Sequence, residues 1–177
     1  EEVTLKSKKK ATQRSFIQTK NVFTVNSAEL LKAACCNLAE SFETNPSIDV
    51  NFSDALTGTR QIQMLGLKSP YLLITQENIP SIRGAGQVFG LTFTPGTWVE
   101  SIQITKGAGS VINGYESISG QINAELVKPL TDNRIFLNAY GSLGGRYELN
   151  SHLNHKISDK WQTGIYIHGN YRNKKFD

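Results

Sequence analysis

Residues 98–127 read WVESIQITKGAGSVINGYESISGQINAELV, and this stretch decides the fold. From Ser101 to Thr105, polar residues alternate with Ile102 and Ile104, which predicts a strand with one buried face and one wet face. Glycine-rich sequence then leads to a second predicted strand at 120–127. The stretch therefore predicts two strands of a small sheet.

Two helix starts lie on the N-terminal side of this stretch. A short apolar strand at 22–25 leads to Ser27, which we predict to be the N-cap of a helix that begins at Ala28. Asn37 and Glu40 have the spacing of a capping box, which predicts a second helix. Both helices are short.

Further β segments complete this part of the chain. They are predicted at 48–52, 61–65 and 71–75, in addition to the two strands above. Two short helices and about five short strands predict a compact α+β domain that ends near Pro129. We expect this domain to span residues 21–130.

Beyond residue 131 the predicted strands are longer. In 161–172 one parity reads Trp-Thr-Ile-Ile-Gly-Tyr and the other reads Gln-Gly-Tyr-His-Asn-Arg, so one face is apolar and the other polar. The same alternation occurs more weakly in 147–154 and in 134–140. Because the joints at 141–145 and 158–160 are short, we predict an antiparallel meander of three strands over residues 131–177.

The length of the last strand leaves two interpretations open. Trp161 and Tyr171 lie ten residues apart on the apolar parity, which is ~33 Å along a strand, and a tilt of ~40° reduces this to ~25 Å of height. That height matches the apolar band of an outer-membrane barrel between its aromatic girdles. An ordinary β-sandwich sheet with one wet face is the alternative. Three strands cannot close a barrel, so either the chain is truncated or these strands pair elsewhere.

Charge is distributed unevenly along the chain. Lys and Arg total 19 against 15 for Asp and Glu. Residues 1–20 hold six basic and two acidic side chains, which leaves 13 of each sign in residues 21–177. A basic segment on a neutral body lacks the chain-wide positive field of a nucleic-acid-binding protein, so no nucleic-acid partner is expected. We expect residues 1–20 to form a flexible arm in which only 2–5 is extended.

The apolar runs are too short for a spanning helix, which needs ~20 residues. The chain opens without an initiator Met or an apolar leader, so we expect a processed or excised segment. Cys35 and Cys36 are adjacent and cannot form a disulfide framework. Small buried residues are the default interpretation of this pair, and binding of a soft metal is the alternative.

Four motifs follow one another within the opening stretch: VESIQI at 99–104, KG at 106–107, Tyr115, and SGQIN at 119–123. They resemble the Ile-Glu-Arg-Ile-Glu-Val, Arg-Gly-Pro, Tyr-Gly and Gly-Gly-Val-Ile-Asn pattern of TonB-dependent outer-membrane receptors. The resemblance implies a small plug domain, with a short mixed sheet and two or three short helices, followed by the first three strands of an incomplete outer-membrane β-barrel.

The sequence departs from the family pattern where the plug is joined to the barrel. Residues 64–66 read Met-Leu-Gly in place of Ile-Arg-Gly, and Lys106 replaces the arginine of Arg-Gly-Pro. In the family these arginines lock the plug to acidic groups on the barrel wall, so the resemblance leaves Glu100 and Lys106, at most, as the plug–barrel lock. The usual Asp-Gly-Val-Pro turn appears at 77–80, where Asn78 tolerates a positive φ.

The resemblance implies a ligand-gated transporter of the outer membrane, with the plug in the barrel lumen and the N-terminal arm in the periplasm. It places the TonB-binding segment at Glu2, Val3, Thr4 and Leu5, which adds as a strand to the TonB partner. A disordered terminus is the alternative for this segment.

The same resemblance places ligand-facing loops at 67–71 and 79–96, where charge, hydrogen-bonding groups and aromatic rings are available. The candidate ligand-binding residues are Lys68, Ser69, Tyr71, Arg83, Gln87 and Phe89. A glycine-rich connector without ligand contacts is the alternative for the second loop. The implied partner is a small-molecule ligand such as a metal chelate, and iron chelate, corrinoid, metal complex and glycan all remain open.

Other chemistries find little support in the sequence. The glycine spacings fit neither the dinucleotide fingerprint nor the P-loop, so no cofactor is expected. His152 and His155 are three apart on a strand and hence on opposite faces, so they cannot ligate one metal there, and no metal site is expected. No readable catalytic arrangement occurs, so we do not expect an enzyme. The second functional hypothesis is a soluble periplasmic interaction module with a plug-like fold.

Overall fold

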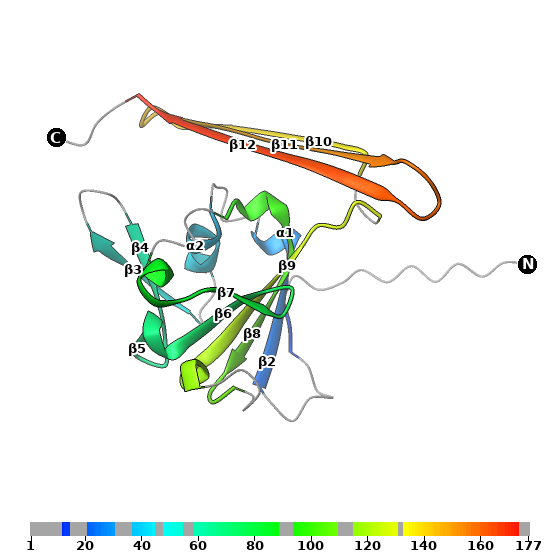
Figure 1. Cartoon of the computed structure of the whole chain (residues 1–177). Helices are drawn as coiled ribbons and strands as arrows, with labels where there is room; N and C mark the ends of the chain where they lie inside the picture. Colours follow the sequence, from blue (N-terminus) through cyan, green and yellow to red (C-terminus); the bar gives the residue numbers. More distant parts are fainter. Residues whose placement is uncertain are drawn as a thin grey trace, which may run out of the picture.

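The computed structural model describes residues 12–14, 21–30, 37–44, 48–54, 59–88, 94–109, 115–130 and 133–173. The largest sheet in these ranges has six strands in the order β1-β2-β8-β9-β6-β7 (Figure 1). These strands are β1 (Thr12–Arg14), β2 (Asn21–Asn26), β6 (Leu72–Gln76), β7 (Ile79–Ile82), β8 (Val99–Lys106) and β9 (Gly120–Leu126). β6 and β9 run parallel, and the other neighbouring strands run antiparallel.

Short helices and a second sheet pack near the six-stranded sheet. The helices are α1 (Ser27–Leu30) and α2 (Leu38–Ser41), and the second sheet contains β3 (Asp49–Asp54), β4 (Thr59–Met64) and β5 (Leu67–Lys68). Single 3-10 turns connect these elements: η2 (Phe42–Thr44), η3 (Ser69–Tyr71), η4 (Gly84–Val88), η6 (Gly96–Trp98) and η8 (Tyr115–Ser117). No helix among the described residues is long and apolar enough to cross a membrane.

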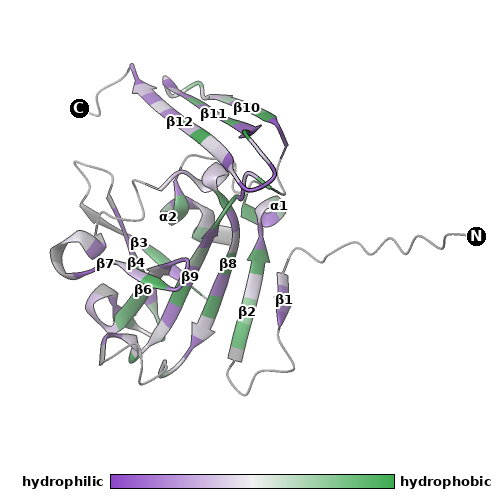
Figure 2. Cartoon of the chain, turned by 45° about the vertical axis from the view of Figure 1, so that its right-hand side comes forward, coloured by the Kyte–Doolittle hydropathy of each residue, from purple (hydrophilic) through white to green (hydrophobic). Residues whose placement is uncertain are grey.

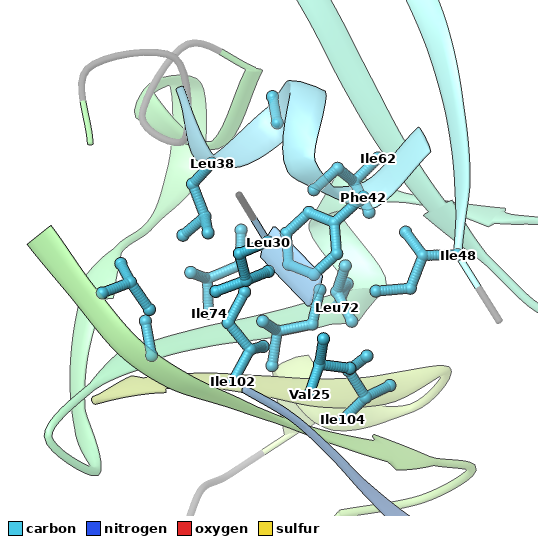
Figure 3. Close-up of a cluster of buried hydrophobic side chains, with 14 of the residues drawn as sticks. Val25, Leu30, Leu38, Phe42, Ile48, Ile62, Leu72, Ile74, Ile102 and Ile104 are labelled. Carbon is cyan, nitrogen blue, oxygen red and sulfur yellow. The ribbon is translucent and has the colours of Figure 1, made fainter. Parts of the chain in front are cut away.

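The hydrophobic core lies between these two groups of elements. Ile102 and Ile104 of β8 are fully buried, while Ser101 and Gln103 between them are half-buried, which confirms the predicted alternation. Figure 3 shows Leu38 and Phe42, from the helical side, in one cluster with side chains of the sheet. Hydrophobic and hydrophilic residues alternate along β8 and β9 in Figure 2. The mixed α+β fold class predicted for this part is confirmed.

The two helix starts illustrate how local polar groups fix the chain. At α2, Asn37 Oδ1 accepts from the Glu40 amide at 3.0 Å and Asn37 Nδ2 donates to Glu40 Oε1 at 3.2 Å, which confirms the capping box. At α1 the prediction is wrong by one residue. The helix begins at Ser27, and Asn26 is its N-cap. The Asn26 side-chain Oδ1 accepts at 3.2 Å from the backbone N–H of Glu29, a first-turn donor that has no acceptor within the helix.

The predicted meander is present as a separate three-stranded antiparallel sheet. Its strands are β10 (Ile135–Gly141), β11 (Arg146–Lys156) and β12 (Gln162–Arg172), of 7, 11 and 11 residues. The register pairs Leu153 with both Ile135 and Ile165, so residues of the same parity share a face across all three strands. In Figure 1 the three strands lie side by side above the helices.

Burial decides between the two interpretations of this sheet. The polar parity of β11 packs inward: Asn150 is 3% exposed and His152 is 3% exposed. The apolar parity points away, with Leu137 68% exposed and Ile167 55% exposed. A soluble β-sandwich buries its apolar face instead, so the observed arrangement resembles that of strands in an outer-membrane barrel.

Candidate functional site

Some of the predicted functional residues lie outside the described ranges. These are the TonB-binding segment Glu2, Val3, Thr4 and Leu5, the ligand-loop residue Phe89, and the cysteines Cys35 and Cys36. The remaining ligand-loop and lock residues are described, and they lie in different places on the fold.

The two predicted ligand loops meet at a corner built from η3, η4 and η8. The Ser119 amide and its hydroxyl both donate to the Tyr71 carbonyl, at 3.0 and 2.8 Å, so η3 is tied to the segment before β9. Gln87 is buried, and its Nε2 donates to the Leu72 carbonyl at 3.0 Å, which ties η4 to the start of β6. Gln87 therefore positions the loop, and its predicted contact with a ligand stays a prediction.

The exposed side of this corner carries charge and apolar surface together. Lys68 is exposed on β5, and Tyr71 is 47% exposed. Arg83 Nε lies 3.0 Å from Glu116 Oε2, which holds the guanidinium at the corner. Ser69 belongs to η3 beside them. Large exposed hydrophobic side chains on the neighbouring segments are Leu65, Leu67 and Ile118. The corner thus offers the Lys68 ammonium, the Arg83–Glu116 ion pair and an apolar, partly aromatic surface to solvent.

The two predicted lock residues lie on β8. Glu100 is exposed, and the Lys106 ammonium lies 5.3 Å from the centre of the Phe23 ring, a cation–π distance. The structure places Lys106 against a neighbouring strand of the plug, whereas other residues make the contacts with β10–β12.

An ion-pair network joins α2 to the polar face of β11. Arg146 Nη1 lies 3.1 Å from Glu40 Oε1, and Arg146 Nε lies 2.6 Å from Glu148 Oε1. Glu40 Oε1 also accepts from Asn37 Nδ2, and Arg60 Nη2 of β4 lies 3.9 Å away. The Glu40 side chain is 10% exposed and the Glu148 side chain 1% exposed. In the contact between the two elements, β11 therefore supplies the cation and α2 the carboxylate.

Aromatic contacts extend the same interface along β12. The Tyr166 hydroxyl donates to the Val127 carbonyl at 2.9 Å, and its ring lies 6.0 Å from the Trp98 ring. On the other side, the His152 ring lies 5.4 Å from the Tyr166 ring and 4.4 Å from the Phe136 ring. These contacts fix the end of β9 against the three-stranded sheet.

Arg146 and Tyr166 are interface residues that the sequence patterns did not indicate. Both belong to the polar parity of their strands. That parity is the sequence feature that could have indicated residues facing the rest of the protein. Their partners Glu40 and Val127 are distant in sequence, so pattern alone could not name them. His152 is buried and His155 exposed, which confirms that they lie on opposite faces. The described residues contain no cluster of His, Cys, Asp and Glu able to hold a metal.

Glu77, whose carboxyl has a lowered pKa, anchors the turn between β6 and β7. The Lys128 ammonium donates to Glu77 Oε1 and lowers the pKa of Glu77 below its ordinary value. Partial burial acts in the opposite direction, and the Leu126 amide, 2.7 Å from the same oxygen, lowers the pKa further. Glu77 and Asn78 both have positive φ, of 53° and 63°, so the predicted turn geometry is confirmed at Asn78.

Comparison with known proteins agrees with this architecture. The TonB-dependent Receptor Plug Domain family matches residues 14–121, more than half of the chain. The search of curated proteins gave no match.

Solved structures with a similar fold include uptake and import receptors. The ferric yersiniabactin uptake receptor FyuA from Yersinia pestis gives a TM-score of 0.70 at 16% identity, over 88% of this chain and 25% of that one. The alcaligin outer membrane receptor FauA from Bordetella pertussis gives 0.73 at 14% identity, over 88% and 27%. The ferric-catecholate import receptor Fiu from E. coli K12 gives 0.69 at 18% identity, over 86% and 21%.

The chain thus spans about a quarter of the length of these receptors. With the plug match, the mixed sheet and the outward-facing apolar strands, the chain belongs to the TonB-dependent receptor plug-domain family.

Proposed function

We propose that the protein containing this chain imports a scarce extracellular small molecule across the outer membrane, with energy supplied through TonB. The observation that carries the proposal is the inverted burial of β10–β12, whose polar face packs on the plug while the apolar face points outward. That arrangement suits a strand between a wet lumen and lipid. A soluble periplasmic module would expose the same apolar face to water, which is costly.

The proposed division of the chain follows from this function. Residues 1–20 form the periplasmic arm with the TonB-binding segment, 21–130 form the plug inside the barrel lumen, and 131–177 form the first three strands of an outer-membrane barrel. The Tyr166 hydroxyl donates to the carbonyl of Val127, the residue that follows β9, so the proposed plug and wall are in contact where the chain leaves the plug sheet.

The ligand-binding surface that we propose is the corner of η3, η4 and η8. Lys68 supplies a positive charge, Arg83 supplies a half-exposed guanidinium that is paired with Glu116, and Tyr71 supplies an exposed aromatic ring. Such a surface suits an anionic, partly aromatic metal chelate, because cations pair with its acidic groups and its rings pack on apolar surface. Several solved structures of this fold are named for ferric chelates, which supports the same class. Ser69 and Phe89 belong to the same loops, and their contacts with ligand are part of the proposal.

The plug is proposed to be held by charge pairs with the wall. Glu40 and Arg146 form one such pair in the described strands. Glu100 and Lys106 are proposed to meet strands that follow residue 177 in the whole barrel. Release of such pairs would let a pulling partner remodel the plug without unfolding the barrel.

The test uses the whole membrane protein in a TonB-containing host. Val3→Pro in the TonB-binding segment removes a backbone N–H and blocks strand addition. We expect uptake of radiolabelled iron, presented as ferric catecholate or hydroxamate chelates, to fall at least ten-fold while cell-surface binding of the same chelates is unchanged. Lys9→Pro, in the same arm, is the control and should leave both unchanged. Normal uptake by the Val3→Pro variant would contradict the proposal.

A further inference from the structure

A pocket of about 400 Å³ opens on the face of the six-stranded sheet that lies opposite the hydrophobic core. Part of its lining is one register row, in which Asn26 of β2 is paired with Ser101 of β8, and Ser101 with Glu125 of β9. Because successive side chains of a strand point to opposite faces, this row faces away from the core. The core residues next to it in the chain are Val25, Ile102 and Ala124.

The pocket carries negative charge. Glu125 is half-buried, and its carboxylate accepts from the Gln103 amide at 2.9 Å and from the Ser101 hydroxyl at 3.2 Å. Both donors are neutral, so they hold the carboxylate in place without cancelling its charge. Glu100 is exposed at the rim, and none of the lining residues that the structure describes is Lys or Arg. The pocket therefore suits a cation.

Strand β1, at the edge of the sheet beside β2 (Figure 2), brings the basic arm to this pocket. Gln13 of β1 lines the pocket, and Thr12 is paired with Val25 in antiparallel register. In that register the chain reaches Thr12 from the end of β2, where the first residues of α1 also line the pocket.

The distances bring a basic run of three lysines, at residues 8–10, within reach of the carboxylate. Glu125 lies three strand spacings from β1, ~14 Å across the sheet. Lys10 is three residues from Gln13, which allows up to ~10 Å of extended chain. The flexible four-carbon stem of a lysine adds to this reach.

We propose that the basic run at 8–10 docks in this pocket, with a lysine ammonium paired to the Glu125 carboxylate. The short connection favours the contact, because a tethered group has a high effective concentration at a site that it can reach. Glu100 remains available for its proposed contact with the wall. Leu5 is three residues from Lys8, so docking holds the proposed TonB-binding segment within ~10 Å of the pocket until a partner competes for it.

The test is zero-length crosslinking of the whole membrane protein, purified in detergent without TonB. A carbodiimide activates carboxylates, which then form an amide with a lysine amine in contact, and mass spectrometry of the digested protein identifies the joined peptides. We expect Glu125 to be joined to residue 8, 9 or 10. The yield should fall at least about five-fold in 1 M salt, because the Debye length shrinks from ~10 Å at 0.1 M to ~3 Å.

A second measurement needs no crosslink: the initial rate of trypsin cleavage after residues 8–10 in the same protein. Glu125→Gln keeps an acceptor for its two donors but loses the charge. We expect it to raise this rate about three- to five-fold, the upper range for a partly exposed ion pair. Asp49→Asn removes an exposed carboxylate from the other plug sheet and should leave the rate unchanged.

Three results would overturn the proposal. They are crosslinks from Glu125 only to lysines outside 8–10, a crosslink yield that does not change with salt, and equal cleavage rates in Glu125→Gln and the parent protein. The first would show that the wall or another segment fills the pocket. Because TonB is absent, the import result for Val3→Pro has no bearing on these outcomes. The Lys9→Pro control of that test retains two lysines for the pocket.

Discussion

A single side chain, Glu77, links backbone geometry to charge in the plug. Its φ of 53° is unfavourable for a residue with a Cβ, yet the turn it forms with Asn78 gives β6 and β7 their antiparallel pairing. The carboxylate compensates by accepting from the Leu126 amide and the Lys128 ammonium. It thereby connects the turn to the segment that leaves the plug.

The lowered pKa of Glu77 predicts an acid-dependent contribution to stability. Because the folded-state pKa lies below the ordinary value, the stabilisation is present above the unfolded-state pKa and is lost as the pH falls through the folded-state pKa. Glu77→Gln should lower the free energy of unfolding by less than about 1 kcal/mol at pH 7, since the pair is half exposed. At pH ~3 the difference between variant and parent should shrink.

The free energy of unfolding is measured by urea denaturation at the two pH values. Trp98 fluorescence in a Trp161→Phe background reports the transition. Lys128→Gln and the double variant complete a double-mutant cycle. A coupling energy that is the same at both pH values would show that the Glu77 charge is not responsible.

At the scale of elements, sequence patterns predicted what is locally encoded. The capping box at Asn37 was predicted because both partners lie within one turn. The strands β1, β5 and β7 were missed because they have two to four residues, too few for an alternation to be recognised. The alternation of β10–β12 was predicted, but its burial was left open, because only packing against the plug makes the polar face the inner one.

The candidate site was predicted less completely, because its contacts join residues that are distant in sequence. Lys68, Tyr71 and Arg83 were named from their loops, and the structure gathers those loops at one corner. Burial of Gln87 depends on a carbonyl in β6, which the loop sequence does not reveal. The Glu40–Arg146 pair joins residues 106 apart in sequence, so no spacing rule could indicate it.

Helix α2 is the element that should respond when the plug is released from the wall. It has four residues and depends on outside contacts: the Leu38 amide donates to the Thr94 carbonyl at 2.8 Å, and Glu40 pairs with Arg146 at 3.1 Å. Arg146→Gln should accelerate hydrogen exchange of the Glu40 and Ser41 amides on the order of ten-fold, because Glu40 loses its wall partner while remaining buried.

Arg172→Gln provides the matched control for this experiment, since Arg172 is the exposed register partner of Arg146 on β12. Exchange at α2 should be unchanged in that variant. Equal acceleration in both variants would indicate a general loosening of the sheet, and no acceleration in either would show that α2 does not depend on the wall.

For the whole molecule, the decisive property is the direction in which β10–β12 presents its apolar residues. Ile167 lies in the middle of β12, with Ser151 as its register partner, and Ser151 in turn pairs with Leu137. The next residue, His168, points the other way and its Nδ1 lies 2.7 Å from Asn150 Oδ1. Two adjacent residues therefore sample lipid and lumen in the proposed membrane arrangement, which makes them a matched pair for testing it.

Ile167→Lys should impair folding of the whole protein into lipid vesicles, because it places an ammonium in hydrocarbon. The free energy of folding should become less favourable by about 2–4 kcal/mol if the residue lies near the bilayer midplane. His168→Lys puts the same charge on the wet face and should cost far less, even though it removes the contact with Asn150. The measurement is the folded fraction in vesicles across a denaturant series, read from the mobility of heat-sensitive bands on gels. If both variants fold equally well, the apolar face does not contact lipid, and the membrane placement fails. If His168→Lys is the more damaging variant, the polar ladder on β11 and β12 outweighs the lipid contact, and the wall is held mainly by its plug.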